Sequence, residues 1–245
     1  MNDFKIEILN KDELKDLFKM YGLAAAVCYN TPEKFAVGVG KSCLETKHMS
    51  PSRSRYITFK FEGISRACAE QLVRHSVGTA ISMQSGRYVK LGEDFSYHTP
   101  TPILRNPKAK EIYDNHMKLV SENYKAICEA LEEDGLKGES VYECARGVSP
   151  MSYHVKLVMS FNLEALINLM HKRLCTCAQE EIRKVAREMK KQVIELVPEL
   201  EEHLVAVCQS QLYCPESPKR TCGLYPQKSE LKEVLKMYTN EKKNI

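Results

Sequence analysis

Residues 74–88 hold the densest group of potential anion-binding side chains in the sequence. This segment contains Arg74, Arg87, His75, three serines, one threonine and two glycines. Arginine presents a planar fork of donors that matches phosphate, and glycine lets the backbone approach a ligand closely. The segment therefore predicts a site for a phosphorylated substrate or cofactor. On residue types alone, a solvated turn with surface ion pairs remains the alternative.

A predicted helix precedes this segment and favours the ligand-binding interpretation. Ile64, Cys68, Gln71 and Arg74 recur at helical spacing through residues 63–74. A rigid helix that ends at the polar segment would hold its donors in fixed directions. We therefore expect residues 74–88 to be an aimed anion-binding loop.

Two later stretches also place polar groups where chemistry needs them. Asn162, Asn168 and Arg173 interrupt a leucine-rich helical pattern, so they require polar partners or a ligand if the helix is buried. Arg146 lies where a short helix breaks before Pro150. Taken separately, a salt bridge is the simpler explanation for either arginine.

The ten cysteines do not follow a metal-binding pattern. Cys175 and Cys177 are closer together than a zinc-binding pair, and no CxxC spacing accompanies Cys208, Cys214 and Cys222. In a reducing compartment most cysteines act as small buried apolar residues. The sequence therefore predicts free thiols and no metal site.

Composition limits the class of protein. The chain has 245 residues, of which 43% are hydrophobic, and these suffice for one substantial core. No apolar run approaches the roughly 20 residues that span a bilayer, and residues 1–5 do not resemble a signal peptide, so we expect a cytoplasmic protein without a membrane partner. The net charge of +4 suits an enzyme of anionic small molecules as well as a weak nucleic-acid binder. Aromatic residues do not alternate with basic ones as in a single-strand-binding surface, so nucleic acid is not an expected partner.

Hydrophobic patterns predict an α+β fold, with an antiparallel or mixed sheet flanked by helices in a single domain. Strands are expected at residues 4–9, 55–61 and 155–161. Beyond the helix before the polar segment, helices are expected at residues 11–18, 32–45, 108–133, 163–171 and 178–196. Thr31 is expected to cap the helix at 32–45, and residues up to 107 form the longest loop. We expect the domain to cover residues 1–225, with a C-terminal tail at 226–245.

An ordered series of motifs resembles the flavin-dependent thymidylate synthases. It consists of residues 48–51, 59–66, 71–75, 84–88, 143–146, Asn162, Asn168, Arg173, 178–183 and 214–216. Three positions depart from the family pattern: Ser76 replaces the third residue of an Arg-His-Arg motif, Arg53-Ser54 stands where Glu-His is common, and Cys177 replaces a histidine. Each motif is weak by itself, whereas their order is specific.

The resemblance implies a fold, a reaction and an assembly. The family's α+β subunits form a homotetramer with shared active sites that bind FAD and dUMP. Methylenetetrahydrofolate donates the carbon, NADPH reduces the flavin, and dUMP is reductively methylated to dTMP. The family uses no cysteine nucleophile, which agrees with the lack of a Pro-Cys-Gln motif here.

The resemblance also implies roles for individual residues. Substrate binding is expected from seven of them: Gln71, Arg74, Ser85, Gly86, Arg87, Arg146 and Arg173. Cofactor binding is expected from Arg74, His75, Ser76, Asn162, Asn168 and Cys177. Arg173 is the expected catalytic residue, because a fixed cation at the uracil edge stabilises charge that develops as the ring becomes nucleophilic.

Two other functions remain open at this point. The first is that of a divergent relative of the family, which would keep the flavin and the pyrimidine nucleotide but add another group to the ring, such as hydroxymethyl. A noncatalytic nucleotide-binding or nucleic-acid-binding protein could use the same phosphate-binding loop, with a steep salt dependence and no chromophore.

Overall fold

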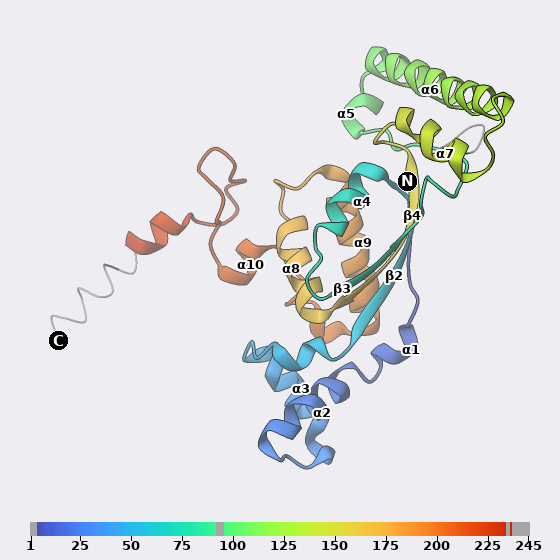
Figure 1. Ribbon diagram of the computed structural model, residues 1–245. Coiled ribbons are helices and arrows are strands. Elements are labelled where there is room, and N and C mark those ends of the chain that lie inside the picture. Colours follow the sequence, from blue (N-terminus) through green and yellow to red (C-terminus); the bar gives the residue numbers. More distant parts are fainter. Residues whose placement is uncertain (1–3, 92–95, 234–235, 237–245) are drawn as a thin grey trace. The chain divides into compact units, whose positions relative to one another are not determined.

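The computed structural model describes residues 4–91, 96–233 and 236 (Figure 1). The chain divides into two compact units. Unit 1 comprises Met1–Leu9 and Thr58–Ser160, and unit 2 comprises Asn10–Ile57 and Phe161–Ile245. No helix in the described ranges combines the length and apolar character needed to cross a membrane.

A four-stranded sheet carries much of the buried apolar surface. It contains β1 (Lys5–Ile8), β2 (Tyr56–Ser65), β3 (Thr79–Met83) and β4 (His154–Asn162), in the order β1-β2-β4-β3. Strand β1 pairs antiparallel with β2, so that Ile8 lies opposite Phe59. Alternate residues are buried, including Ile6 and Ile8 in β1 and Phe59 and Phe61 in β2. The period-two pattern therefore predicted β1, β2 and β4 correctly.

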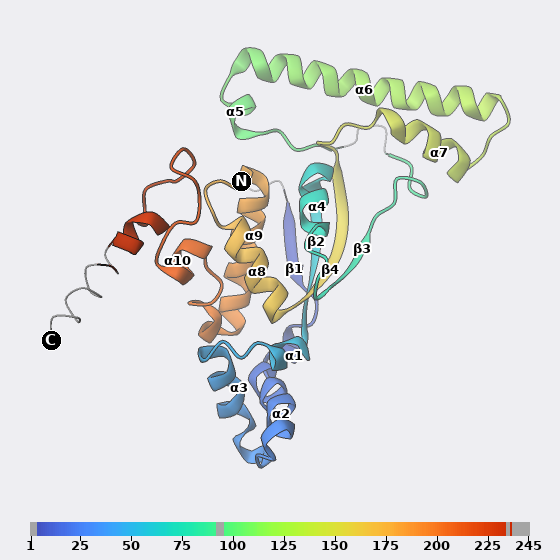
Figure 2. The ribbon, with the colours of Figure 1, turned by 60° about the vertical axis from the view of Figure 1, so that its left-hand side comes forward.

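Unit 1 also contains α4 (Arg66–Val73), α5 (Thr101–Leu104), α6 (Pro107–Glu133), α7 (Glu139–Ala145) and the 3₁₀ turn η3 (Arg146–Val148). The Ser65 hydroxyl caps α4 by accepting a hydrogen bond from the Cys68 N–H at 3.0 Å. Helices α6 and α7 lie alongside each other (Figure 2). A small core of Tyr124, Cys128, Val141 and Ala145 joins them.

Unit 2 is mainly helical. Its elements are α1 (Lys11–Leu14), α2 (Leu17–Tyr29), η1 (Glu33–Phe35), α3 (Ala36–Glu45), η2 (Ser50–Arg53), α8 (Leu163–Arg173), α9 (Glu180–Leu196), η4 (Pro198–Leu200) and α10 (Val207–Gln211). The predicted apolar stripe of α9 is confirmed from Ile182 to Val193, whereas Leu196 is 40% exposed. Helices α2 and α3 touch through backbone, because a Cβ atom on Gly22 would lie 1.6 Å from the Ala36 carbonyl oxygen.

Several predicted element boundaries are wrong. The helix expected at residues 11–18 ends at Leu14, and α2 follows it as a separate helix. The helix expected from Pro32 begins instead with the turn η1, and Pro32 rather than Thr31 occupies the position before it, without a side-chain cap. The run of small residues in α2 concealed its period, since alanine and glycine contribute little to a hydrophobic pattern.

The long loop expected before residue 107 is also wrong, because it contains β3 and α5. The β-branched Thr79 and Ile81 lie in β3, and just beyond this strand the Gln84 N–H donates to the Lys156 carbonyl at 2.9 Å. Strand β2 continues through Gly63, which adopts a positive φ of 75°, although Glu62-Gly63 was expected to end it. Pairing with a distant strand therefore overrides the local turn signal.

Candidate functional site

A polar cleft in unit 1 brings together two of the predicted substrate-binding residues. The cleft has a volume of about 380 Å³ and is lined by Arg66, Gly86, Arg146, Gly147, Ser149, Met151 and Tyr153. A Cβ atom on Gly86 would lie 3.7 Å from Cδ of Arg146. The loop after β3 and the end of α7 therefore meet at this cleft.

Backbone hydrogen bonds fix the start of α4 beside the same cleft. The Arg66 N–H donates to the Tyr153 carbonyl and the Ala67 N–H donates to the Met151 carbonyl, each at 2.9 Å. The Arg66 guanidinium forms an ion pair with Glu70 at 2.7 Å, one helical turn later. Arg66 is thus held in place by both its backbone and its side chain.

Ser149 supplies an unsatisfied hydroxyl to the cleft. Its Oγ is buried and has no hydrogen-bond partner among the described residues. Burying a hydroxyl without a partner costs free energy, so such atoms are usually paired in folded proteins. A ligand oxygen in the cleft would satisfy this hydroxyl.

The loop after β3 is a tight turn centred on Ser85. The Ser85 carbonyl accepts hydrogen bonds from the N–H groups of Tyr88 and Val89 at 3.2 and 3.1 Å, and its hydroxyl accepts one from the Arg87 N–H at 3.2 Å. The Arg87 guanidinium forms ion pairs with Glu143 at 2.9 Å and Glu139 at 3.5 Å. Its side chain is nevertheless 45% exposed, so solvent and ligands have access to it.

Four further residues, predicted to bind substrate (Gln71 and Arg74) or cofactor (Arg74, His75 and Ser76), lie around the end of α4 and do not line this cleft. The Gln71 amide donates to the Ala67 carbonyl at 3.3 Å, within α4. Arg74 is the exposed C-terminal cap residue of α4, and Ser76 is exposed just beyond it. The His75 carbonyl accepts a hydrogen bond from the Thr79 hydroxyl at 2.9 Å. These residues follow one another along the chain, and their roles in ligand binding stay predictions.

A larger cleft lies in unit 2 and contains Asn168. Its volume is about 640 Å³, and its polar lining includes Lys47, Glu164, Asn168, His171, His203 and Gln209. Burial lowers the pKa of His171, and the positive charge of Lys47 lowers it further. Burial also lowers the pKa of His203, although Glu202 and Glu45 oppose this shift. Both rings therefore favour the neutral form.

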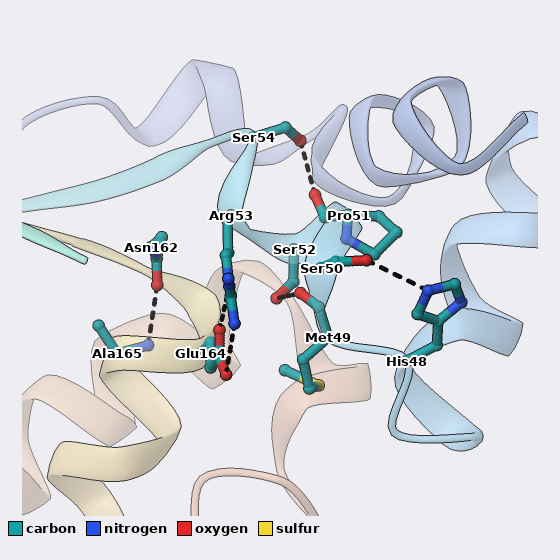
Figure 3. Close-up of polar contacts among 10 residues, drawn as sticks. All are labelled: His48, Met49, Ser50, Pro51, Ser52, Arg53, Ser54, Asn162, Glu164 and Ala165. Carbon is teal, nitrogen blue, oxygen red and sulfur yellow. Dashed lines mark hydrogen bonds and ion pairs between the residues drawn. The ribbon is translucent and has the colours of Figure 1, made fainter. Parts of the chain in front are cut away.

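Figure 3 shows how the start of α8 is organised. The Asn162 side-chain oxygen accepts a hydrogen bond from the Ala165 N–H at 2.9 Å and so caps α8. Arg53 forms a two-pronged ion pair with Glu164, with 3.2 Å between Nη2 and Oε1. His48 and Ser50 form a further hydrogen bond at 3.1 Å. Arg53, the first of the two residues that stand where the family commonly has Glu-His, therefore forms a structural ion pair.

Arg173 and Cys177 do not line the cleft that contains Asn168. Arg173 is the last residue of α8 and is partly buried. Cys177 lines a separate cleft of about 190 Å³, where its thiol donates to the Arg220 carbonyl at 3.2 Å. Of the predicted cofactor residues in unit 2, the structure thus places only Asn168 in the larger cleft.

Comparison with known proteins identifies the family. The sequence profile described as thymidylate synthase complementing protein, Thy1, matches residues 12–199. The chain belongs to this family. A flavin-dependent thymidylate synthase of Nitratidesulfovibrio vulgaris is 42% identical over 185 residues, which cover 76% of this chain and 75% of that relative. One from Clostridium tetani is 33% identical over 195 residues, with 76% of each chain covered.

A solved structure shares the fold. It is a UMP/dUMP methylase, PolB, from Streptomyces cacaoi, bound with 5-Br UMP, with a TM-score of 0.59 and 18% identity. The alignment covers 86% of this chain and 95% of that one. The predicted family and the α+β fold are thereby confirmed.

For this Thy1 family member, the structure adds site residues that the sequence analysis did not assign. They are Arg66, Ser149 and Tyr153 in unit 1, and Lys47, His171 and His203 in unit 2. Arg66 lies within the family motif at residues 59–66, so the sequence could have identified it. No local pattern singles out Ser149, because its buried hydroxyl depends on contacts between distant segments.

Proposed function

We propose that this protein reductively methylates dUMP to dTMP, with FAD as its cofactor, methylenetetrahydrofolate as the carbon donor and NADPH as the reductant. The named activity of the two relatives supports this assignment. The departures at Ser76, Arg53-Ser54 and Cys177 make the donor and the product the points that most need testing.

The cleft around Arg146 is the observation that carries the proposal. Arg66 and Arg146 line it together with Ser149, whose buried hydroxyl is unpaired among the described residues. Gly86 keeps its wall free of a side chain. Cationic and neutral donors around a small concave space suit a nucleotide monophosphate.

The remaining substrate residues are proposed to complete nucleotide binding. Ser85 and Arg87 would hold the phosphate, with Gln71 and Arg74 beside the nucleotide. Because Arg87 is paired with Glu139 and Glu143, it must exchange a carboxylate for the phosphate when dUMP binds. This exchange lowers the net gain from the arginine, since an existing ion pair is lost.

Arg173 is proposed as the catalytic residue. A permanent cation beside the uracil carbonyls would stabilise negative charge as C5 of the ring attacks the one-carbon unit. Such a donor acts on charge that develops in the transition state, so its loss should reduce turnover more than binding.

The cleft containing Asn168 has a donor set that fits a flavin cofactor. Lys47 supplies a cation for a diphosphate, while Asn168, Gln209 and neutral histidines supply hydrogen bonds at an apolar wall of Leu44, Met49 and Ile167. When bound and reduced, FAD supplies the hydride that converts the transferred methylene carbon into a methyl group. His75, Ser76, Arg74 and Asn162 are proposed as further flavin contacts.

A homotetramer in the cytoplasm, with active sites shared between subunits, completes the proposal. Shared sites would bring residues from separate copies to one ligand, which residue spacing within a single chain does not reveal. Light scattering of the purified protein tests the tetramer.

Three measurements test the reaction. The purified protein should be yellow with a flavin absorption spectrum, and tritium should leave the uracil C5 of labelled dUMP only when both NADPH and the folate donor are present. Mass analysis should then show a product heavier by one CH2 unit, because a methyl group replaces the hydrogen at C5. A product carrying a hydroxymethyl group would replace the proposed reaction with the divergent one. Colourless protein with no effect on dUMP would contradict both.

A further inference from the structure

The smaller cleft of unit 2 contains half of the cysteines in the chain. Cys175, Cys177, Cys208, Cys214 and Cys222 all line it, together with Glu216. The sequence contains ten cysteines, so this concentration is far from even. The Cys175-Thr176-Cys177 segment and the C-terminal segment are separated in sequence, and only folding brings their thiols together.

Three of these side chains bring their possible metal-ligand atoms close together. One ligand atom from each of Cys175, Cys177 and Glu216 lies within 4.8 Å of the other two. A tetrahedral zinc site with Zn–S bonds of about 2.3 Å places neighbouring ligand atoms about 3.7 Å apart. The three groups would therefore need to move by only about 1 Å to share one ion.

Polar contacts already surround the proposed ligand atoms. The Cys177 N–H donates a hydrogen bond to the Cys175 sulfur at 3.5 Å, which is the type of contact that orients a ligating thiolate. The Glu216 carboxylate has a loose ion pair with Arg220, at 3.5 Å, that a metal ion would replace. Cys208 lines the same cleft as these three residues.

Hydrogen bonds rather than regular secondary structure hold the segment after α10. After α10, residues 212–227 form an irregular loop that is closed by an isolated bridge between Cys214 and Gln227. The Gln227 side chain also donates to the Glu216 carbonyl at 3.0 Å. Small irregular segments without a core of their own are commonly fixed by a metal or a covalent crosslink.

We infer that this cleft binds a structural Zn²⁺ ion through Cys175, Cys177 and Glu216, with Cys208 as the fourth ligand. Binding converts the three thiols to thiolates and releases their protons to solvent, so no oxidant or reductant is needed. This inference replaces the sequence-based expectation of no metal site. It also gives Cys177 a role other than flavin binding.

Metal analysis of the full-length protein tests the inference. After incubation with Zn²⁺ and removal of excess ion, mass spectrometry of the metal content should give one zinc per chain. The double variant Cys175→Ser/Cys177→Ser should lose this zinc, whereas Cys28→Ser/Cys144→Ser, which changes two exposed cysteines outside the cleft, should retain it. Circular dichroism of each variant checks that the fold persists.

A second measurement uses the unmodified protein and so does not depend on a variant that folds. Titration of reactive thiols should find three fewer in the zinc-loaded protein than after treatment with a chelator. Cys177→Ser should lower zinc content without lowering flavin content, and the opposite result would assign Cys177 to the flavin. If zinc does not bind stoichiometrically and all thiols react equally with and without chelator, the inference is overturned. Neither readout requires methylation of dUMP, so the two proposals fail independently.

Discussion

Basic side chains near the clefts of the two units differ in how their charge is compensated. In unit 1, Arg87 is paired with Glu139 and Glu143, and Arg66 with Glu70. In unit 2, the cleft around Asn168 contains two histidines whose pKa values are lowered by burial. These two arginines of unit 1 therefore stay charged and are balanced by carboxylates, whereas burial disfavours the charged form of the two histidines in the unit 2 cleft.

This difference suggests two kinds of ligand. Paired arginines retain full charge and can exchange a carboxylate for a phosphate dianion, which suits a nucleotide. Half-buried imidazoles in the neutral form donate or accept single hydrogen bonds and suit a weakly charged ring. Arg173, at the end of α8 in unit 2, also stays charged at any physiological pH.

Replacing Arg173 should produce the largest effect. Arg173→Ala should lower kcat by about 10²–10³-fold, as for the loss of one transition-state donor, while flavin content changes little. Steady-state kinetics and the flavin absorption of the purified variant measure the two quantities. Arg173→Lys is the control that keeps the charge. Parallel losses of folding and activity in both variants would indicate a structural ion pair.

Arg87 and its carboxylate partner should show opposite effects on dUMP binding. Arg87→Ala should weaken binding by roughly 1–3 kcal/mol, which corresponds to about 5–150-fold in Kd. Glu143→Gln should leave binding unchanged or tighten it, because it removes the competing carboxylate. Isothermal calorimetry gives both values. Equal weakening in the two variants would mean that Arg87 serves only the α7 ion pair.

Removing the cap of α8 should have a moderate effect on stability. Asn162→Ala should lower the free energy of unfolding by about 1–2 kcal/mol, because the Ala165 N–H loses its acceptor. Chemical denaturation measures this value. Asn106→Ala is the matched control, because it removes the equivalent asparagine cap from α6 at an exposed position. Asn162→Asp keeps an acceptor oxygen for the Ala165 N–H. If this variant has the normal free energy of unfolding but a lower flavin content, Asn162 has a role in flavin binding that is separate from its role as the cap.

The smallest effect concerns pH. Since His171 and His203 have lowered pKa values in the folded protein, the unfolded chain binds protons first as the pH falls below about 6.5. The stability that these neutral rings contribute is present above that pH and is lost as the pH falls through the folded pKa values. His171→Gln should flatten this slope in denaturation measured across the acidic range. An unchanged slope would leave His203, with Lys47, Glu45 and Glu202 around it, as the main titrating site.

Sequence patterns predicted the elements with strong periodicity and missed those without it. The amphipathic α9 and the alternating β1 were predicted because each exposes one face and buries the other. Strand β3 was missed because four of its five residues, Thr79, Ala80, Ile81 and Ser82, show no alternation in burial. Its existence depends on pairing within the sheet rather than on local preference.

The sequence predicted those residues of the candidate site that lie in family motifs. Gly86 and Arg146 were both expected at the nucleotide, and the structure does place them at one cleft. The cysteine cleft was not predictable, because no spacing in the sequence relates Cys175 to Cys208 or Glu216. Ligand sets assembled by tertiary folding leave no short motif.

The contact between α2 and α3 limits the residues that these helices tolerate. Cβ atoms at Gly22 and Gly40 would lie 1.6 and 2.0 Å from the carbonyl oxygens of Ala36 and Phe18. Even alanine, which has a higher helix propensity than glycine, would force the two backbones apart at both positions. In a saturation library of this protein, these two sites should therefore accept no substitution, while Gly38, with open space around it, should accept many.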